Sequence, residues 1–196
     1  MTFAGRLILV RHGQTEWSKS GKHTGRTDIE LTDQGRDEAV AARATLEDLQ
    51  IAAVFSSPLR RARETAEIVG LKPDIVFDDR LLEWDYGSAE GQRTVDMREH
   101  IDDWSVWTHP DTTAETVDEV GDRIDSFIGG ALSGLAGDVA VFAHGHLLAV
   151  FIARWLQLSA VEGRRFKLDT ATVSLLDFHR QDRVMRALNH RCGDRL

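Results

Sequence analysis

Short apolar runs of strand length recur along the chain, and each is followed by polar residues. Residues 6–10 (RLILV) and 51–57 (IAAVFSS) are two of them, and residues 138–146 (DVAVFAHGH) contain a third. Apolar runs of this kind are typical of strands that are buried on both faces of a sheet. The pattern therefore predicts three strands of a mostly parallel sheet.

The segments after these runs have the spacing of amphipathic helices. Apolar side chains in residues 32–49 recur at intervals of three and four, and Thr32 is the predicted N-cap. Ser57 and Pro58 form the expected N-cap and first residue of a second helix. A third helix is predicted over the apolar residues 147–158.

Strands that alternate with helices predict the α/β class, here a three-layer α/β/α sandwich with a mostly parallel central sheet. Residues 172–178 and 183–188 add a predicted antiparallel hairpin. With 196 residues, 42% of them hydrophobic, and no obvious linker, the chain is expected to form a single domain over residues 1–196.

The charge balance limits the expected partners. A formal net charge of −8 argues against a nucleic-acid or anionic-membrane surface, since either would need an extended basic face. Residues 1–10 lack the pattern of a signal peptide, and residues 147–158 are shorter than the roughly 20 residues that span a bilayer. The single cysteine, Cys192, has no partner for an internal disulfide. We therefore expect a cytoplasmic protein that binds neither nucleic acid nor membrane, while a homodimer stays open.

Polar side chains follow each of the three predicted strands. Ligands of open α/β sheets bind outside the carboxyl ends of the strands, so these side chains are expected to meet. They are Arg11, His12, Arg60, Arg61, His144 and His146. Two imidazoles and at least two guanidiniums on an acidic protein predict a local site for a compact dianion such as phosphate.

The same inventory suits phosphoryl transfer, because that reaction mainly needs positioning and cationic groups. The chain contains neither a GxSxG elbow nor a GxxxxGK[ST] phosphate loop, and no run typical of an aspartyl nucleophile. Histidine remains as the candidate nucleophile. Its imidazole can attack phosphorus through one nitrogen when the other nitrogen holds its proton on a fixed acceptor.

Four segments together resemble the signature blocks of the histidine phosphatase superfamily, also called the phosphoglycerate mutase-like family. They are RHGQT, SSPLRRARETA, LLEWDYGSAEG and AHGH, in the family's order between about residues 7 and 155. The resemblance implies the phosphoglycerate mutase-like fold, with His12 as the nucleophile that accepts the phosphoryl group. It also implies that Arg11, Arg61 and His144 clamp the phosphate.

The resemblance further implies that Glu83 is the acid/base carboxylate, and that neither a metal nor a cofactor is needed. His144 and His146 have the His-x-His spacing of some metal sites, but no carboxylate or Cys cluster joins them in the sequence. The family pattern also suggests residues that contact substrate, which are Ser18, Thr24, Gly25, Tyr86, Glu115 and His146.

Within the family, a phosphatase is favoured over a phosphoglycerate mutase. The longer mutases place a Lys eight residues beyond the position of Tyr86, where this chain has Thr94. The chain is most similar to a subgroup of bacterial acid phosphatases and sedoheptulose- or fructose-bisphosphatases, which implies a small phosphorylated substrate. Three positions depart from the patterns: Ser18 replaces an Asn, Ala114 a Gly, and Ala149 an Arg.

Some alternatives stay open at this point. A non-catalytic phosphate-binding module would be expected to lose His12 or Glu83, and the chain retains both. Trp104 and Trp107 are expected to pack in the core, with a substrate lid as the alternative. His109 is a weak candidate for the rim of the pocket.

Overall fold

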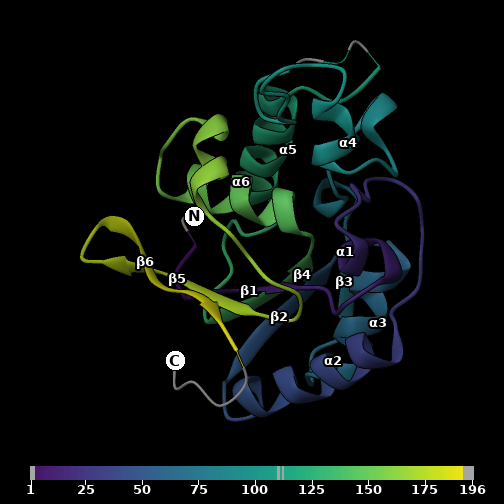
Figure 1. Ribbon diagram of the computed structural model, residues 1–196. Coiled ribbons are helices and arrows are strands. Elements are labelled where there is room, and N and C mark those ends of the chain that lie inside the picture. The colour runs from purple at the N-terminus through teal and green to yellow at the C-terminus, as the bar shows by residue number, and fades with distance from the viewer. Residues whose placement is uncertain (1–2, 110, 112, 192–196) are drawn as a thin grey trace.

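A six-stranded mixed sheet forms the centre of the part of the chain that the structure describes, residues 3–109, 111 and 113–191 (Figure 1). In this computed structural model the strand order is β3-β2-β4-β1-β5-β6. β1 to β4 run parallel to one another, whereas β5 runs antiparallel to β1, and β6 antiparallel to β5. The strands are β1 (Leu7–Arg11), β2 (Ile51–Ser56), β3 (Ile75–Phe77), β4 (Asp138–Ala143), β5 (Val173–His179) and β6 (Asp182–His190). The predicted sheet and the predicted hairpin are both confirmed.

Helices cover both faces of this sheet. Figure 1 shows α2 and α3 on one side and α5 and α6 on the other. The helices are α1 (Glu16–Ser20), α2 (Asp33–Leu46), α3 (Arg60–Val69), α4 (Thr94–Arg98), α5 (Val117–Gly130) and α6 (Gly145–Trp155). Short 3-10 helices lie at Asp79–Leu81, Gly87–Ala89 and Ala160–Arg165. The predicted three-layer α/β/α sandwich is confirmed.

The alternation of side chains along β1 explains why two layers of helices are needed. Leu7 and Leu9 belong to the apolar cluster shared with α5 and α6, whereas Ile8 and Val10 belong to the cluster shared with α2 and α3. All four side chains are fully buried, because successive residues of a strand point to opposite faces. Each stabilises the fold by roughly 2 kcal/mol through burial.

The ends of the helices follow the predictions only in part. Thr32 is the N-cap of α2, as predicted, and its hydroxyl accepts the N–H of Gly35. The predicted N-cap at Ser57 is wrong, since α3 begins at Arg60 after an N-cap at Leu59. The helix predicted over residues 147–158 begins and ends earlier than expected, as α6 at Gly145–Trp155.

Two further expectations concern the chain as a whole. Among the residues that the structure describes, no helix has the length and apolar character needed to cross a membrane. Cys192, which the sequence suggested to be a free thiol, lies outside the described residues.

Candidate active site

The carboxyl ends of β1, β2 and β4 meet at one edge of the sheet and bring distant residues together. Arg11 of β1 is paired in register with Ala143 of β4, so His12 and His144 follow their strands side by side. The centroids of the two imidazole rings lie 5.2 Å apart. The convergence expected from the sequence is therefore present.

His12 is held as a neutral imidazole with one free nitrogen. Its ring is 4% exposed, and Nδ1 lies 2.7 Å from the carbonyl oxygen of Gly13. A carbonyl oxygen only accepts hydrogen bonds, so Nδ1 carries the proton and Nε2 keeps its lone pair. Burial, together with the charges of Arg61 and Arg11, lowers the pKa of His12 well below its usual 6.5. Nε2 is thus available as a nucleophile.

His144 is oriented by Arg61 and Ser57. Nε of Arg61 donates to Nδ1 of His144 at 3.1 Å, so the proton of the ring is on Nε2, which donates to the hydroxyl of Ser57 at 2.8 Å. Burial and the charge of Arg61 lower the pKa of His144 well below 6.5. The hydroxyl of Ser57 also accepts the N–H of Leu59 at 3.3 Å, so it links His144 to the residue that precedes α3.

The side chain of Arg61 is fully buried at the site, where it forms hydrogen bonds with other parts of the chain. Its terminal nitrogens donate to three carbonyl oxygens of the loop at residues 24–27, at 2.9 to 3.0 Å. Neither Arg61 nor His144 lines the cavity described below. Arg61 therefore fixes the loop and the imidazole, and its direct contact with phosphate stays a prediction. Its neighbour Arg60 has a side chain that is 49% exposed, as expected for a solvated residue.

Arg11 has a buried donor without a partner. One terminal nitrogen donates to the carbonyl oxygen of Leu168 at 2.6 Å, but Nε has no hydrogen-bond partner among the residues that the structure describes. A buried N–H without an acceptor is costly, so an anionic ligand would satisfy it. The guanidinium lies over Gly145, where a Cβ would approach its central carbon to 3.3 Å. Gly145 thereby leaves room for this cation.

Glu83 is held by backbone groups beside the histidines. Its side chain is 4% exposed, and its carboxyl oxygens accept N–H groups from Trp84, His146 and Leu147 at 2.9 to 3.2 Å. Two of these donors belong to the first turn of α6, whose N-terminus favours a carboxylate. The three hydrogen bonds fix the direction of the carboxyl group, as proton transfer requires.

The rings of Tyr86, His146 and His23 form a second polar group of the site. The hydroxyl of Tyr86 lies 2.6 Å from Nδ1 of His146. Burial raises the pKa of Tyr86 well above 10, so the phenol that shares this hydrogen bond stays neutral. Burial also lowers the pKa of His146 to about 4 and that of His23 to about 4. His23 contacts Tyr86 with ring centroids 5.0 Å apart.

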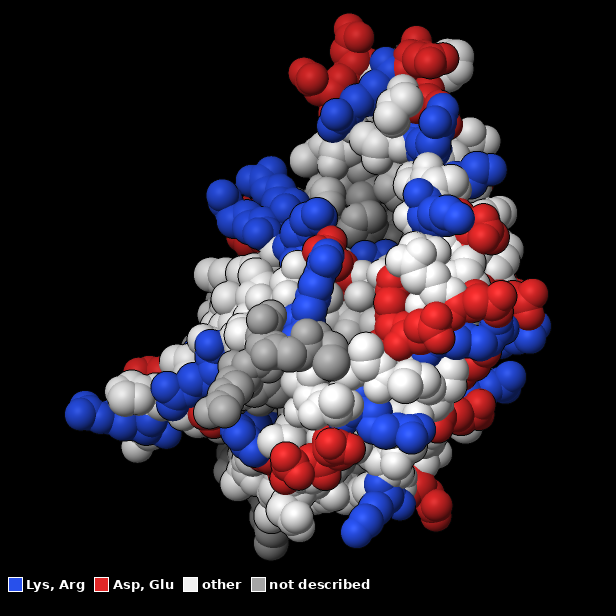
Figure 2. Space-filling view, turned by 60° about the horizontal axis from the view of Figure 1, so that its bottom comes forward, with Lys and Arg blue, Asp and Glu red and all other residues white. Residues whose placement is uncertain are grey.

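These side chains line a cavity of about 290 Å³. Figure 2 shows Lys and Arg side chains on both sides of a hollow in this region of the surface. The predicted site residues that line the cavity are Arg11, His12, Ser18, Thr24, Glu83, Tyr86 and His146. The other lining residues are Lys22, His23, Trp107, Gly145, Arg164, Phe166, Lys167 and Leu168. Three cations of this second group, Lys22, Arg164 and Lys167, escaped prediction.

Two predicted substrate-binding residues do not line this cavity. Gly25 lies against the backbone of Trp84, where a Cβ would fall 2.5 Å from the carbonyl oxygen, so this position needs glycine for close packing. The carboxylate of Glu115 forms an ion pair with Arg123. Contact of either residue with substrate stays a prediction.

A neighbouring cavity of about 560 Å³ shares Tyr86 and Trp107 with the first. His109 lines this neighbouring cavity instead of the catalytic one. Trp104 is buried in the core, whereas Trp107 lines both cavities. In the part of the chain that is described, no three His, Cys, Asp or Glu side chains form a group that could hold a metal ion.

Comparison with known proteins places these features in a wider context. The sequence profile of the Histidine phosphatase superfamily (branch 1) matches residues 7–191. The acid phosphatase of Mycobacterium tuberculosis is 43% identical over 186 residues, which cover 93% of this chain and 91% of that protein. The sedoheptulose 1,7-bisphosphatase of Saccharomyces cerevisiae is 37% identical over 185 residues, which cover 78% of this chain and 68% of that protein. The solved structure of the product of open reading frame Rv3214 from Mycobacterium tuberculosis superimposes with a TM-score of 0.90 at 41% identity, covering 96% of this chain and 99% of that one.

Proposed function

Since the chain belongs to the histidine phosphatase superfamily, we propose that it hydrolyses small phosphorylated metabolites, sugar phosphates or sugar bisphosphates, through a phosphohistidine on His12. The observation that carries this proposal is the state of His12: Nδ1 is bound to a carbonyl oxygen, Nε2 keeps its lone pair, and Arg11 offers a buried N–H without a partner. The relatives named acid phosphatase and sedoheptulose 1,7-bisphosphatase support the same reaction class.

In the first step, Nε2 of His12 attacks phosphorus, and the bond from phosphorus to the leaving oxygen breaks. A sugar alkoxide is a poor leaving group, so the carboxylic acid of Glu83 transfers its proton to that oxygen. Arg11 and Arg61 offset the negative charge on the phosphoryl oxygens during the transfer. The alcohol leaves, and the phosphoryl group remains on His12.

In the second step, the carboxylate of Glu83 takes a proton from water, and the water oxygen attacks the phosphohistidine. The bond from nitrogen to phosphorus breaks, so inorganic phosphate is released and His12 regains its lone pair. Glu83 is again protonated and ready for the next substrate. This two-step sequence needs no metal or cofactor.

The cations at the mouth of the cavity favour a substrate with a second anionic group. Lys22, Arg164 and Lys167 line the cavity together with Arg11. Gly163 packs so closely on Ala149 that a Cβ would lie 3.0 Å from its carbonyl carbon. Arg164 therefore lies close to the position at which the similar bisphosphatases have an Arg.

We place the enzyme in the cytoplasm, as a single domain over residues 1–196, with a homodimer to be tested by light scattering.

The first test is release of inorganic phosphate from sedoheptulose 1,7-bisphosphate, fructose 1,6-bisphosphate, 3-phosphoglycerate and p-nitrophenyl phosphate, with EDTA present, between pH 4 and pH 8. Wild type and Arg60→Ala should release phosphate, whereas His12→Ala should not. Quenching in alkali, in which phosphohistidine is stable, should trap a labelled phosphoprotein in wild type and Arg60→Ala but not in His12→Ala.

Three results would contradict the proposal. Full activity of His12→Ala would exclude this nucleophile. Absence of phosphate release from every compound, together with isomerisation of 3-phosphoglycerate in the presence of 2,3-bisphosphoglycerate, would identify a mutase instead. Binding of phosphate without any turnover would leave a non-catalytic module.

A further inference from the structure

Glu83 lies in a stretch of backbone that has no regular secondary structure. It follows the 3-10 helix Asp79–Leu81 and precedes the 3-10 helix Gly87–Ala89. Between these helices no strand ladder or helical turn fixes the chain. Backbone N–H groups hold the Glu83 carboxyl group itself, but the main chain that carries Glu83 depends on side chains that bind this segment from outside.

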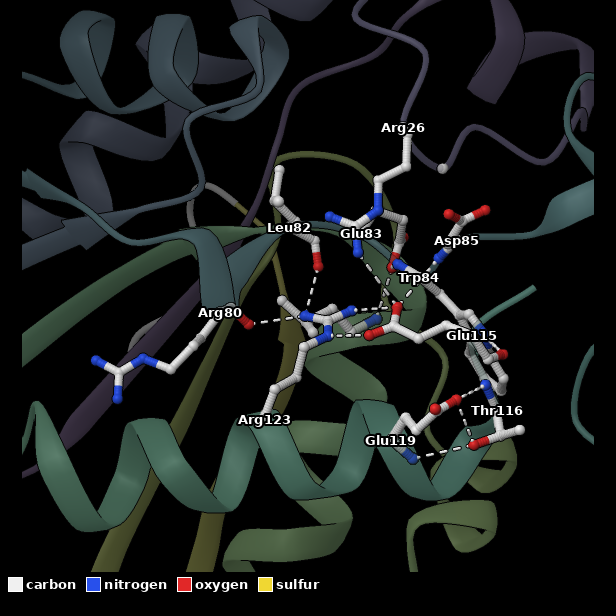
Figure 3. A network of polar contacts seen from close by, with 12 residues as sticks. Arg26, Arg80, Leu82, Glu83, Trp84, Asp85, Glu115, Thr116, Glu119 and Arg123 are labelled. Atoms are coloured by element: carbon white, nitrogen blue, oxygen red, sulfur yellow. Dashed lines mark hydrogen bonds and ion pairs between the residues drawn. The ribbon is translucent and has the colours of Figure 1, made fainter. Parts of the chain in front are cut away.

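Arg123 of α5 binds the segment immediately before Glu83 (Figure 3). One terminal nitrogen donates to the carbonyl oxygens of Arg80 and Leu82, both at 2.7 Å. The other terminal nitrogen and Nε donate to the two carboxylate oxygens of Glu115, at 3.0 and 2.6 Å. A planar guanidinium can bind two backbone carbonyl groups and a carboxylate at the same time, because its N–H donors form a rigid fork.

Glu115 binds the segment immediately after Glu83. Its carboxylate accepts the N–H of Asp85 at 3.2 Å and a terminal nitrogen of Arg26 at 3.4 Å. Its backbone carbonyl accepts Nε1 of Trp84 at 2.6 Å, and its backbone N–H donates to the carbonyl oxygen of Asp85 at 3.1 Å. Figure 3 shows Arg123 and Glu115 meeting between α5 and this loop.

We propose that the Arg123–Glu115 pair positions Glu83 for proton transfer, an inference that rests on the proposed function. The pair holds the backbone on both sides of Glu83, and neither of its side chains lines the catalytic cavity. Both side chains are largely buried, at 14% and 15% exposure, so their ion pair is weakly screened by solvent. In this role Glu115 acts through the peptide backbone, since its side chain lines the neighbouring cavity and not the catalytic one.

Two substrates whose leaving groups differ in basicity can distinguish this positioning role from a general contribution to folding. An acid matters for a sugar alkoxide and much less for p-nitrophenolate, which leaves without a proton. We expect Glu83→Gln to lower kcat/KM for fructose 1,6-bisphosphate about 100-fold, and for p-nitrophenyl phosphate by only a few fold. Arg123→Met and Glu115→Gln should show the same contrast, with a loss of about 10-fold or more for the sugar substrate.

A double-mutant cycle then tests whether Arg123 acts through Glu83. In the Glu83→Gln background, Arg123→Met should cause little further loss with fructose 1,6-bisphosphate. Additive losses, or equal losses for the two substrates, would overturn the positioning role and leave the proposed function intact. A Glu83→Gln enzyme with full activity on both substrates would instead overturn the proposed function of Glu83.

Arg154→Met is the matched control, because Arg154 of α6 forms a similar forked ion pair with Asp125 of α5. Its loss removes an ion pair of the same kind, between α5 and α6, without touching residues 80–85. We expect a lower melting temperature and the same ratio of the two kcat/KM values as in wild type. If Arg123→Met does not fold, Arg123→Lys, which keeps the charge but loses the fork, provides the same comparison.

Discussion

At the scale of single residues, the site places a neutral imidazole beside fixed positive charges. His12 lies next to Arg61 and Arg11, and both charges oppose protonation of its ring. An uncharged Nε2 is therefore retained at a pH at which an exposed histidine is already protonated. A histidine nucleophile in this setting suits an enzyme that works in acid.

Arg61→Gln should shift the acid limb of the pH profile of kcat/KM to higher pH. Burial is the first cause of the low pKa of His12, and the charge of Arg61 is the second. Removing that charge raises the pKa of His12, so its ring becomes protonated, and inactive, at a higher pH. The profile is measured with p-nitrophenyl phosphate, and only the position of the limb is compared, because Arg61→Gln also lowers the rate.

Arg60→Gln is the control for this prediction. The side chain of Arg60 is half exposed and forms an ion pair with Glu30 at 2.8 Å. Its substitution removes the same charge from the next position of α3 and should leave the limb where it is in wild type. A limb that stays in place in Arg61→Gln, or moves equally in both variants, would show that Arg61 does not set the pKa of His12.

Side chains that follow strands could be predicted, and side chains from loops could not. Arg11 is the last residue of β1, and His12 and His144 directly follow β1 and β4. Neighbouring parallel strands have their carboxyl ends at the same edge of the sheet, independently of the conformation of the loops. Arg164 and Lys167 reach the cavity through a long segment after α6, whose path depends on packing that no periodicity records. His23 stood out no more in the sequence than the other histidines.

At the scale of elements, the turn after β1 requires a residue without a Cβ. A Cβ at Gly13 would lie 2.2 Å from the carbonyl oxygen of Gly35, at the start of α2. The close neighbour of Gly13 is thus the backbone of α2. The contact brings the first turn of α2 against the loop that carries His12.

Gly13→Ala should lower the free energy of unfolding by about 2 kcal/mol, because two backbone segments must move apart to admit the methyl group. Urea denaturation measures the change. Gly129→Ala in α5 is the control, since a Cβ there meets no atom within 4 Å, and alanine favours a helix over glycine by about 1 kcal/mol. Equal stability of Gly13→Ala and wild type would mean that this contact is not tight in solution.

The longest element that the sequence analysis does not predict is α5, although the sequence contains its signals. Val120, Ile124 and Phe127 recur on one face, and Thr116 forms a capping box with Glu119. The pattern was missed because no apolar strand run precedes it, as one precedes α2, α3 and α6. α3 begins two residues later than the sequence predicts, after an N-cap at Leu59 that forms no side-chain hydrogen bond. Ser57 instead binds His144, a contact between residues 87 positions apart that no local rule anticipates.

At the scale of the whole molecule, the site depends on distant parts of the chain for its charge state. The fold buries His12 and His144, and it partly buries His146 and His23. All four rings have lowered pKa values, and burial is the first cause in each case. In the unfolded chain the same rings are exposed to water and titrate near pH 6.5. Acid therefore acts on the balance between the folded and unfolded states as well as on catalysis.

The stability of the protein should fall as the pH drops below 6.5, and His23 offers a way to measure one share of that loss. Between pH 6.5 and about 4, the unfolded chain binds a proton at this position and the folded chain does not, so acid favours unfolding. The unfolding free energy changes with pH by at most about 1.4 kcal/mol per pH unit for one ring, and over this interval the contribution of His23 reaches at most about 3 kcal/mol.

His23→Gln removes the titrating ring and should flatten the decline of the unfolding free energy across this window, while the slopes above pH 7 stay equal. The unfolding free energy is measured by urea denaturation at steps of half a pH unit. Carboxylates titrate in both proteins, so their effect cancels in the difference between the two free energies, and the contribution of His23 remains. Parallel declines in the two proteins would mean that His23 becomes protonated in the folded state near pH 6.5, and that the fold does not exclude the proton from this part of the site.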